Sequence, residues 1–170
     1  NPAFFIENQV TGNLDAHDDL DPAETATTII KHVEDGLKLA HEYRLPPEVE
    51  TFISEHHGKS TTKYQLSKAK EQLKDGKEVD LSKFEYPGPN PHTRETAILM
   101  MADKVEARAR AEIPKTDEEI TKLVETSIDT LLHDKFLDNT SLSMKNIQAI
   151  KESFFQTLKN TYHHRLKYPK

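Results

Sequence analysis

Apolar residues recur every three or four positions along most of this chain, which is the spacing of one face of an α-helix. The first such segment begins at Asp21, an N-cap residue followed by proline, and runs to about Tyr43. Two prolines at positions 46 and 47 then break the chain and open a second segment. We expect this second helix to reach His57 and to stop at Gly58, because glycine commonly follows a helix end.

The remaining helices are separated by turn-forming residues. We expect them over residues 62–74, 93–111, 116–132 and 143–164. Thr116 with Glu119 three residues later forms a capping box at the start of the fifth helix, and Ser141 or Ser143 caps the sixth. Residues 86–91 hold three prolines and a glycine and therefore form a loop. Because the sequence contains no internal repeat and no credible run of strands, it predicts an all-α fold.

The fourth expected helix contains an unbroken apolar run, residues 97–102, which Asp103 follows directly. A helix that is apolar on all sides is normally buried, so we expect this run in the core. A carboxylate at the edge of such a run is costly to bury without a cation or hydrogen bonds. A salt bridge to Lys104 or Arg108 would account for Asp103, and so would a metal ion.

The composition limits the class of protein. At 170 residues, with 35% hydrophobic and 31% charged residues, the chain fits a single domain over residues 1–170. It contains no cysteine, so any metal must be held by histidine, aspartate or glutamate. The net charge of −6 argues against a nucleic-acid polymer as partner, because binding its backbone requires a basic surface. A small anionic ligand remains compatible, since a bound cation can reverse the local field.

Two adjacent histidines, His56 and His57, lie at the end of the second expected helix. On a helical wheel both fall with Phe52 and Ile53 within one arc of about 140°, so both imidazoles face the core side. A hydrogen-bonded core histidine beside one that interacts with the helix dipole would give the same pattern. Taken alone, the pair favours that structural explanation.

A third histidine, His32, lies beside the apolar stripe of the first helix, and Gly36 lies one turn further along the same face. Glycine costs a helix about 1 kcal/mol relative to alanine, so we expect something to approach the backbone closely at this point. A metal ion with its water, a substrate phosphate or tight helix packing would each require such an approach.

Together, His32, His56, His57 and Asp103 form a candidate set of metal ligands. Three imidazoles and a carboxylate on three core helices suit a two-metal centre, which makes hydroxide at neutral pH and neutralises phosphoryl oxygens. Mixed nitrogen and oxygen ligation suits iron or manganese and is compatible with zinc or nickel. Four ligands are too few for two ions, so the residues predict part of a metal-dependent phosphohydrolase.

Five motifs lie in order along nearly the whole chain. They are Ile30-Lys31-His32-Val33 with Asp35-Gly36, Glu55-His56-His57-Gly58, Phe84-Glu85-Tyr86-Pro87-Gly88-Pro89, Met101-Ala102-Asp103-Lys104-Val105-Glu106-Ala107, and Tyr162-His163-His164-Arg165-Leu166-Lys167-Tyr168-Pro169. In order and spacing the set resembles the HD domain of the seven-transmembrane HD family. The resemblance implies an HD-domain-like helical bundle.

The resemblance also implies a function. The family's domain is a cytoplasmic phosphodiesterase, joined to transmembrane helices of the inner (cytoplasmic) membrane, that hydrolyses cyclic di-AMP to the linear dinucleotide pApA. It uses two divalent metal ions, iron or manganese, and the residues of this chain that match its metal ligands are His32, His56, His57 and Asp103. No catalytic residue beyond the metal ligands is implied.

One departure from the family concerns the start of the chain. The family's first ligand histidine and its His-Asp-Ile-Gly motif lie upstream of a segment that resembles Asn1-Pro2. We therefore expect the 170 residues to be the C-terminal part of a single HD phosphohydrolase domain, truncated at its N-terminus. The two aromatic residues and isoleucine within the first six positions, without a polar lead-in, favour the same interpretation. Such a fragment is expected to be inactive and to bind one ion weakly or none.

Candidate substrate contacts flank the proline-rich loop. Lys68 and Arg94 are expected to meet phosphate oxygens, and Tyr86 or Tyr64 to stack on a base. The alternative for the two cations is an ordinary solvated surface position, and the alternative for Tyr86 is packing beneath its own turn. That alternative stays open at the level of sequence.

The other conspicuous histidines are expected to lie outside the site. His133 precedes Asp134 at a helix end, where a histidine compensates the helix dipole. His163 and His164 belong to a basic terminal segment, and His17 belongs to an acidic one.

Two other functions fit the same residues. One is an HD phosphohydrolase that acts on another nucleotide or cyclic dinucleotide, which would share the metal site and differ in the shape of its pocket. The other is a non-catalytic helical regulatory module whose histidines are structural, and which would retain no metal.

Overall fold

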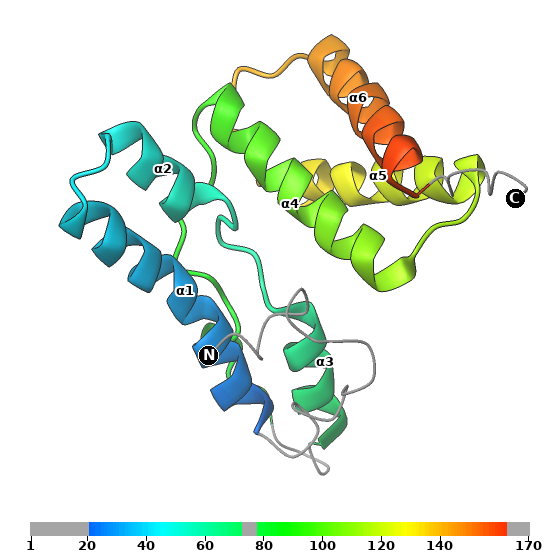
Figure 1. The fold of residues 1–170 in the computed structure, drawn as a ribbon. Coiled ribbons are helices and arrows are strands. Elements are labelled where there is room, and N and C mark those ends of the chain that lie inside the picture. The colour runs from blue at the N-terminus through cyan, green and yellow to red at the C-terminus, as the bar shows by residue number, and fades with distance from the viewer. Residues whose placement is uncertain (1–20, 73–77, 163–170) are drawn as a thin grey trace, which may run out of the picture. The chain divides into compact units, whose positions relative to one another are not determined.

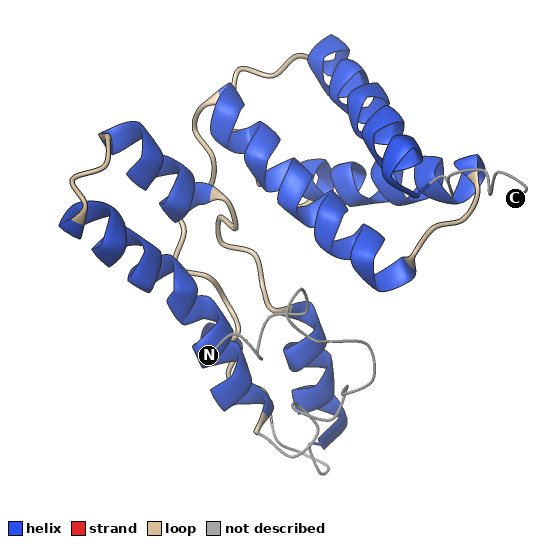
Figure 2. Ribbon diagram, viewed as in Figure 1, coloured by secondary structure: helices blue, strands red, loops and turns tan. Residues whose placement is uncertain are grey.

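The computed structural model describes residues 21–72 and 78–162, which are helices joined by loops (Figures 1 and 2). Over these residues the chain forms six α-helices, one short 3-10 helix (η4) and no strand. The all-α fold expected from the hydrophobic pattern is therefore confirmed. Residue contacts divide the chain into two compact units, Asn1–Pro89 and Asn90–Lys170. That both units belong to one domain over residues 1–170 stays a prediction.

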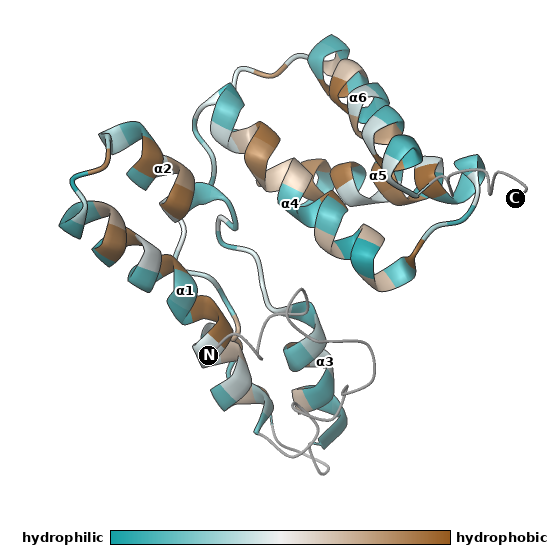
Figure 3. Cartoon of the chain, in the orientation of Figure 1, coloured by the Kyte–Doolittle hydropathy of each residue, from teal (hydrophilic) through white to brown (hydrophobic). Residues whose placement is uncertain are grey.

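The first unit is built around one long helix. Its elements are α1 (Pro22–Glu42), α2 (Pro47–Glu55), α3 (Lys63–Gln72) and η4 (Leu81–Lys83). α1 packs against both α2 and α3 and touches η4. It begins where the sequence predicts, because the Asp21 carboxylate accepts a hydrogen bond from the backbone N–H of Ala23 at 3.3 Å. Apolar and polar residues alternate along α1 and α2 in the manner of helices that bury one face (Figure 3).

The second helix ends two residues earlier than expected. α2 stops at Glu55, and His56 is its C-cap residue, so His57 lies beyond the helix. Gly58 then adopts a left-handed backbone, with φ of 55°, which glycine accepts without steric cost. The chain therefore leaves the helix before Gly58, as expected, but the turn begins at His56.

Gly36 marks a close approach of two helices. A Cβ atom at this position would lie 3.0 Å from Cγ2 of Ile53, which projects from α2. Of the three explanations offered for this glycine, the structure therefore supports tight helix packing. The same packing holds α1, which carries His32, against α2.

The second unit is a three-helix arrangement in which each helix contacts the other two. Its helices are α4 (Arg94–Glu112), α5 (Asp117–His133) and α6 (Met144–Tyr162). The expected capping box at Thr116 and Glu119 is present, and Ser143 caps α6 by accepting a hydrogen bond from the backbone N–H of Asn146 at 3.2 Å. The core is apolar and includes Met101, Val105, Ile128 and Leu131.

One expectation for α4 is wrong. The apolar run 97–102 is not buried all round, because Ile98 and Leu99 are each 38% exposed. Ala97, Met100 and Met101 are buried on the face that packs in the three-helix core. A helix with two neighbours on one side buries only the residues that share that face, whatever the hydropathy of the others.

None of the helices in residues 21–72 and 78–162 combines the length and the apolar character that a bilayer span requires.

Candidate metal centre

Three imidazoles meet in the first unit. His32 projects from α1, His56 caps the end of α2, and His57 follows it. One nitrogen from each ring lies within 4.8 Å of the other two, and all three residues are half-buried. Within the described part of the chain, this is the group of metal-binding side chains that the structure brings together. Two histidines that are 24 residues apart in sequence are therefore neighbours in space.

The backbone fixes the tautomer of two of these rings. Nδ1 of His32 lies 2.6 Å from the carbonyl oxygen of Ile29, and Nδ1 of His56 lies 2.8 Å from that of Ile53. A carbonyl oxygen can only accept, so each Nδ1 must carry the hydrogen and donate. In a neutral imidazole whose Nδ1 is protonated, the other nitrogen, Nε2, carries a lone pair. Both rings are thus oriented as metal-bound histidines usually are, with the non-ligating nitrogen bonded to the protein.

The two Nε2 atoms face each other across 3.1 Å. With both Nδ1 atoms protonated, neither Nε2 of the neutral rings has a hydrogen to offer the other, and two lone pairs at this distance repel. A positive charge between them, either a metal ion or one shared proton, removes the repulsion. The arrangement is therefore prepared for a cation.

The separation fits ligation of a single ion. Nitrogens that are each about 2.1 Å from one ion lie about 3.0 Å apart at a right angle and about 3.4 Å apart at a tetrahedral angle. The observed 3.1 Å between Nε2 of His32 and Nε2 of His56 falls between these values. The donor set of the described cluster is all nitrogen, which suits zinc, iron and nickel among the divalent ions.

The third histidine is packed against an aromatic ring. The His57 ring lies 4.1 Å from the Tyr86 ring, centroid to centroid, with 24° between the planes, which is a stacked geometry. Its centroid is 4.1 Å from that of His56 and 5.0 Å from that of His32. The three imidazoles and the tyrosine therefore form one continuous aromatic cluster.

A buried acid lies beside the cluster in sequence. Glu55, the last residue of α2, is 2% exposed. On the helical wheel it falls outside the arc that contains Phe52, Ile53 and the two histidines, so sequence reasoning missed it. Its burial therefore gave no signal in the hydrophobic pattern of the helix.

The fourth expected ligand, Asp103, belongs to the second unit. It lies on α4 and is half-buried, as expected for a carboxylate at the edge of the apolar run. Arg108, one of the residues considered as its partner, donates to Glu112 at 2.5 Å and to the hydroxyl of Thr126. The role of Asp103 as a metal ligand stays a prediction.

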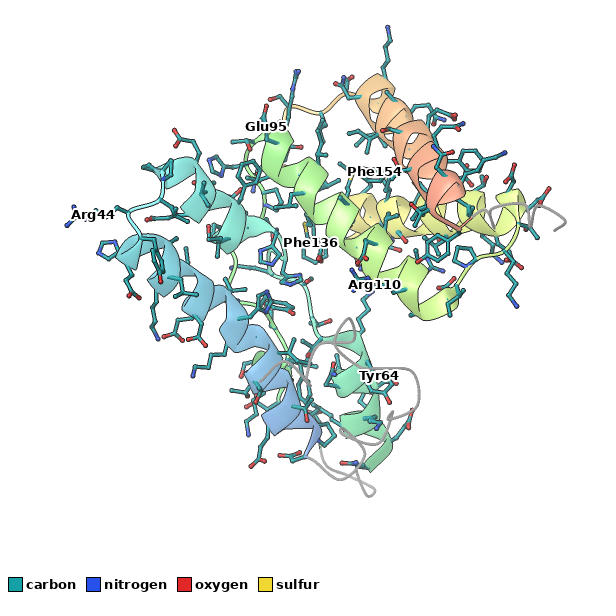
Figure 4. All side chains as sticks on the ribbon, in the orientation of Figure 1. Arg44, Tyr64, Glu95, Arg110, Phe136 and Phe154 are labelled. Carbon is teal, nitrogen blue, oxygen red and sulfur yellow. The ribbon has the colours of Figure 1, made fainter. Side chains whose placement is uncertain are left out.

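The expected substrate contacts lie in different surroundings. Lys68 is half-buried on α3, with its Nζ 5.1 Å from the ring centroid of Tyr64. Tyr64, labelled on α3 in Figure 4, is 60% exposed. Arg94 is exposed at the first position of α4. Tyr86 is only 7% exposed, with one face against His57. Substrate binding by Lys68, Arg94 and Tyr86 stays a prediction.

The histidines expected outside the site divide into two groups. His133 is exposed at the end of α5, where its Nδ1 lies 3.0 Å from the Asp134 carboxylate. These are the surroundings expected of a histidine at a helix end. His17, His163 and His164 lie outside the described residues.

Comparison with known proteins identifies the family. The sequence of the HD domain family matches residues 11–108 of this chain. The cyclic-di-AMP phosphodiesterase PgpH of Bacillus subtilis is 37% identical over 169 residues, and PgpH of Listeria monocytogenes is 35% identical over 172 residues. Each alignment covers 99% of this chain but only 23% of the relative, so the chain spans about a quarter of the length of these proteins.

Solved structures agree with the sequence comparison. The crystal structure of the L. monocytogenes PgpH HD domain matches with a TM-score of 0.86 and 31% identity, over 96% of this chain and 74% of that one. The same domain in complex with cyclic di-AMP also matches with a TM-score of 0.86, over 99% of this chain and 76% of that one. The chain therefore belongs to the HD domain family and is homologous to the HD domain of PgpH.

Proposed function

We propose that this chain is part of a metal-dependent phosphodiesterase that hydrolyses cyclic di-AMP to the linear dinucleotide pApA. The observation that carries the proposal is the pair of Nε2 atoms of His32 and His56, 3.1 Å apart, with both Nδ1 atoms committed to helix carbonyls. The substrate follows from the relatives, since the PgpH HD domain of L. monocytogenes has been crystallised with cyclic di-AMP. Because the chain spans 23% of PgpH, the activity is proposed for the longer protein and not for the 170 residues alone.

Each proposed ligand has a distinct position. His32, His56 and His57 present three nitrogens to one point in the first unit, and Asp103 on α4 is proposed to add a carboxylate oxygen. Two divalent ions, iron or manganese, would be held in the complete domain, with one or none in this chain by itself. When bound, such ions lower the pKa of a coordinated water and neutralise charge on the phosphoryl oxygens.

The chain's own residues hold the ligands in place. The carbonyls of Ile29 and Ile53 keep the Nε2 lone pairs of His32 and His56 directed at the same point. Close packing of α1 on α2 at Gly36 and Ile53 fixes the distance between the two rings. Lys68 and Arg94 are proposed to bind the substrate phosphates as cations. Because these side chains are already in place, the metal site needs less rearrangement when the substrate binds.

The domain is proposed to lie in the cytoplasm, attached to membrane helices elsewhere in the protein. Residues 1–170 would then be the C-terminal part of one HD domain, because the PgpH HD domain matches across both compact units. A nucleic-acid polymer is not proposed as a partner, since the chain carries a net charge of −6.

The test uses the longest natural polypeptide that includes this chain. It is purified with manganese or iron, its metal content is measured by elemental analysis, and hydrolysis of cyclic di-AMP and cyclic di-GMP is followed by chromatography. We expect bound metal and preferential conversion of cyclic di-AMP to pApA. Metal-replete protein that cleaves neither dinucleotide would exclude the proposed substrate class, and protein that retains no metal would favour a structural role for the histidines.

A further inference from the structure

Two short segments of the first unit run side by side next to the histidines. The backbone N–H of Thr62 donates to the carbonyl of Phe84 at 2.9 Å, and that of Tyr86 donates to the carbonyl of Ser60 at 2.9 Å. An antiparallel bridge joins the intervening residues. The position of Tyr86 is therefore tied by backbone hydrogen bonds to the segment that begins three residues after His57.

The Tyr86 ring contacts two of the three imidazoles of the aromatic cluster. It is stacked on His57 at 4.1 Å and 24°, and it meets the edge of His32 at 6.0 Å and 77°. Only 7% of Tyr86 is exposed. With one face against an imidazole and so little surface open, the ring presents little area to a substrate base.

We infer that Tyr86 is a positioning residue, whose ring fixes the plane of the His57 imidazole for metal ligation. The inference rests on the proposed function, because it assigns His57 to the metal centre. It replaces base stacking as the role of this tyrosine.

The position of His57 supports this role. His32 and His56 are oriented by carbonyls of their own helices, at 2.6 and 2.8 Å. His57 lies beyond the end of α2, where the backbone turns toward the left-handed Gly58. A rotation of the His57 ring about its side-chain bonds would separate it from Tyr86, so the stack selects one plane for the ring. Partners that orient metal ligands in this way typically change metal affinity about 10-fold to 100-fold when they are removed.

The experiment compares three variants of the longest natural polypeptide that includes this chain with the wild type, because the 170 residues alone are expected to hold one ion or none. Tyr86→Phe keeps an aromatic ring in the stack, and Tyr86→Leu removes it. Phe84→Leu is the matched control, because Phe84 is 1% exposed in the same segment and no stack with a histidine is assigned to it. Circular dichroism and thermal unfolding show whether each variant is folded at the assay temperature.

Two readouts are measured. In the metal-free chain, NMR records the upfield ring-current shift that a stacked ring imposes on the His57 ring protons. Titration with Mn²⁺, followed by electron paramagnetic resonance of the free ion, gives the dissociation constant. We expect Tyr86→Leu to lose the upfield shift and to bind Mn²⁺ about 10-fold more weakly. Tyr86→Phe and Phe84→Leu should keep the shift and bind within about 3-fold of wild type, although Phe84→Leu lowers the unfolding temperature.

The outcomes separate this inference from the proposed function. An upfield shift that persists in Tyr86→Leu, or unchanged Mn²⁺ affinity in a folded Tyr86→Leu chain, overturns the positioning role and leaves the metal centre standing. Equal loss of affinity in Phe84→Leu also overturns it, since the effect would then be one of general stability. A wild-type polypeptide of this full length that binds no Mn²⁺ counts against the proposed function, and the ring-current shift in the two Tyr86 variants then decides whether Tyr86 orients His57.

Discussion

Replacement of Gly36 by alanine tests how the two histidine-bearing helices are held together. The new Cβ would lie 3.0 Å from Cγ2 of Ile53, whereas carbon atoms in favourable contact are about 3.5–4.0 Å apart. Ile53 is β-branched and lies within α2, so it has one strongly preferred side-chain rotamer and cannot turn this methyl group away cheaply. The helices must then separate by about 0.5 Å or more.

The free energy of unfolding follows from two opposing effects. Overpacking of a well-packed site costs about 1–3 kcal/mol. The gain in helix propensity from glycine to alanine is about 1 kcal/mol. We therefore expect Gly36→Ala to lower the free energy of unfolding by about 1 kcal/mol. In a background with Ile53→Ala, which removes the contacting methyl group, the same change should raise stability by about 1 kcal/mol.

The assay is urea denaturation of the single and double variants, together with titration of a divalent metal. The coupling free energy between the two positions should be about 2 kcal/mol. Separation of α1 from α2 by about 0.5 Å exceeds the tolerance of about 0.2 Å for metal ligands, so Gly36→Ala should also weaken metal binding. An increase in stability on Gly36→Ala in the wild-type background would refute the close-packing explanation.

Three further predictions concern other parts of the chain. Ile113 has a left-handed backbone with φ of 47°, which costs a β-branched residue about 1–2 kcal/mol. Ile113→Gly should therefore raise the free energy of unfolding measured by urea denaturation. A decrease would contradict the assignment of strain. The Ser82 hydroxyl and backbone N–H donate to Asp80 and hold the pKa of that carboxyl below its ordinary value. The resulting contribution to folding stability is present above the ordinary pKa and is lost as pH falls through the lowered pKa. Ser82→Ala should therefore raise the Asp80 pKa, and an unchanged carboxyl titration by NMR would contradict this. In the longest natural polypeptide that includes this chain, the proposed function predicts that His57→Ala abolishes hydrolysis of cyclic di-AMP and that His133→Ala leaves it nearly unchanged. Equal losses in both variants would remove the distinction between ligand and surface histidine.

Helix boundaries could be predicted from the sequence because the signals are local. Asp21 before a proline and the Thr116–Glu119 capping box each set a helix start through hydrogen bonds within three residues. The core-side position expected for His57 assumed a helix that reaches this residue, whereas α2 ends at Glu55, so the place of His57 depends on the turn after the helix. The grouping of His32 with His56 and His57 was proposed from residue chemistry and supported by the family resemblance, whereas the actual distance between the rings depends on how α1 packs against α2.

Features that depend on packing could not be predicted in the same way. The choice between tight packing and ligand approach at Gly36 depends on Ile53, which is 17 residues away and has no sequence signal that pairs the two. Exposure of Ile98 and Leu99 depends on the number of helices that surround α4. The burial of Tyr86 against His57 depends on backbone pairing between residues 60–62 and 84–86, in a loop whose prolines indicated only irregular structure.

The central claim is that His32 and His56 bind one cation through facing Nε2 atoms. The most direct measurement is long-range proton–nitrogen NMR of the histidine side chains while the longest natural polypeptide that includes this chain is titrated with Zn²⁺, a diamagnetic divalent ion. We expect the Nε2 resonances of His32 and His56 to move to metal-bound positions, with both Nδ1 atoms still protonated and His133 unaffected. Nε2 resonances that do not respond to Zn²⁺, or ligation through Nδ1, would contradict the central claim.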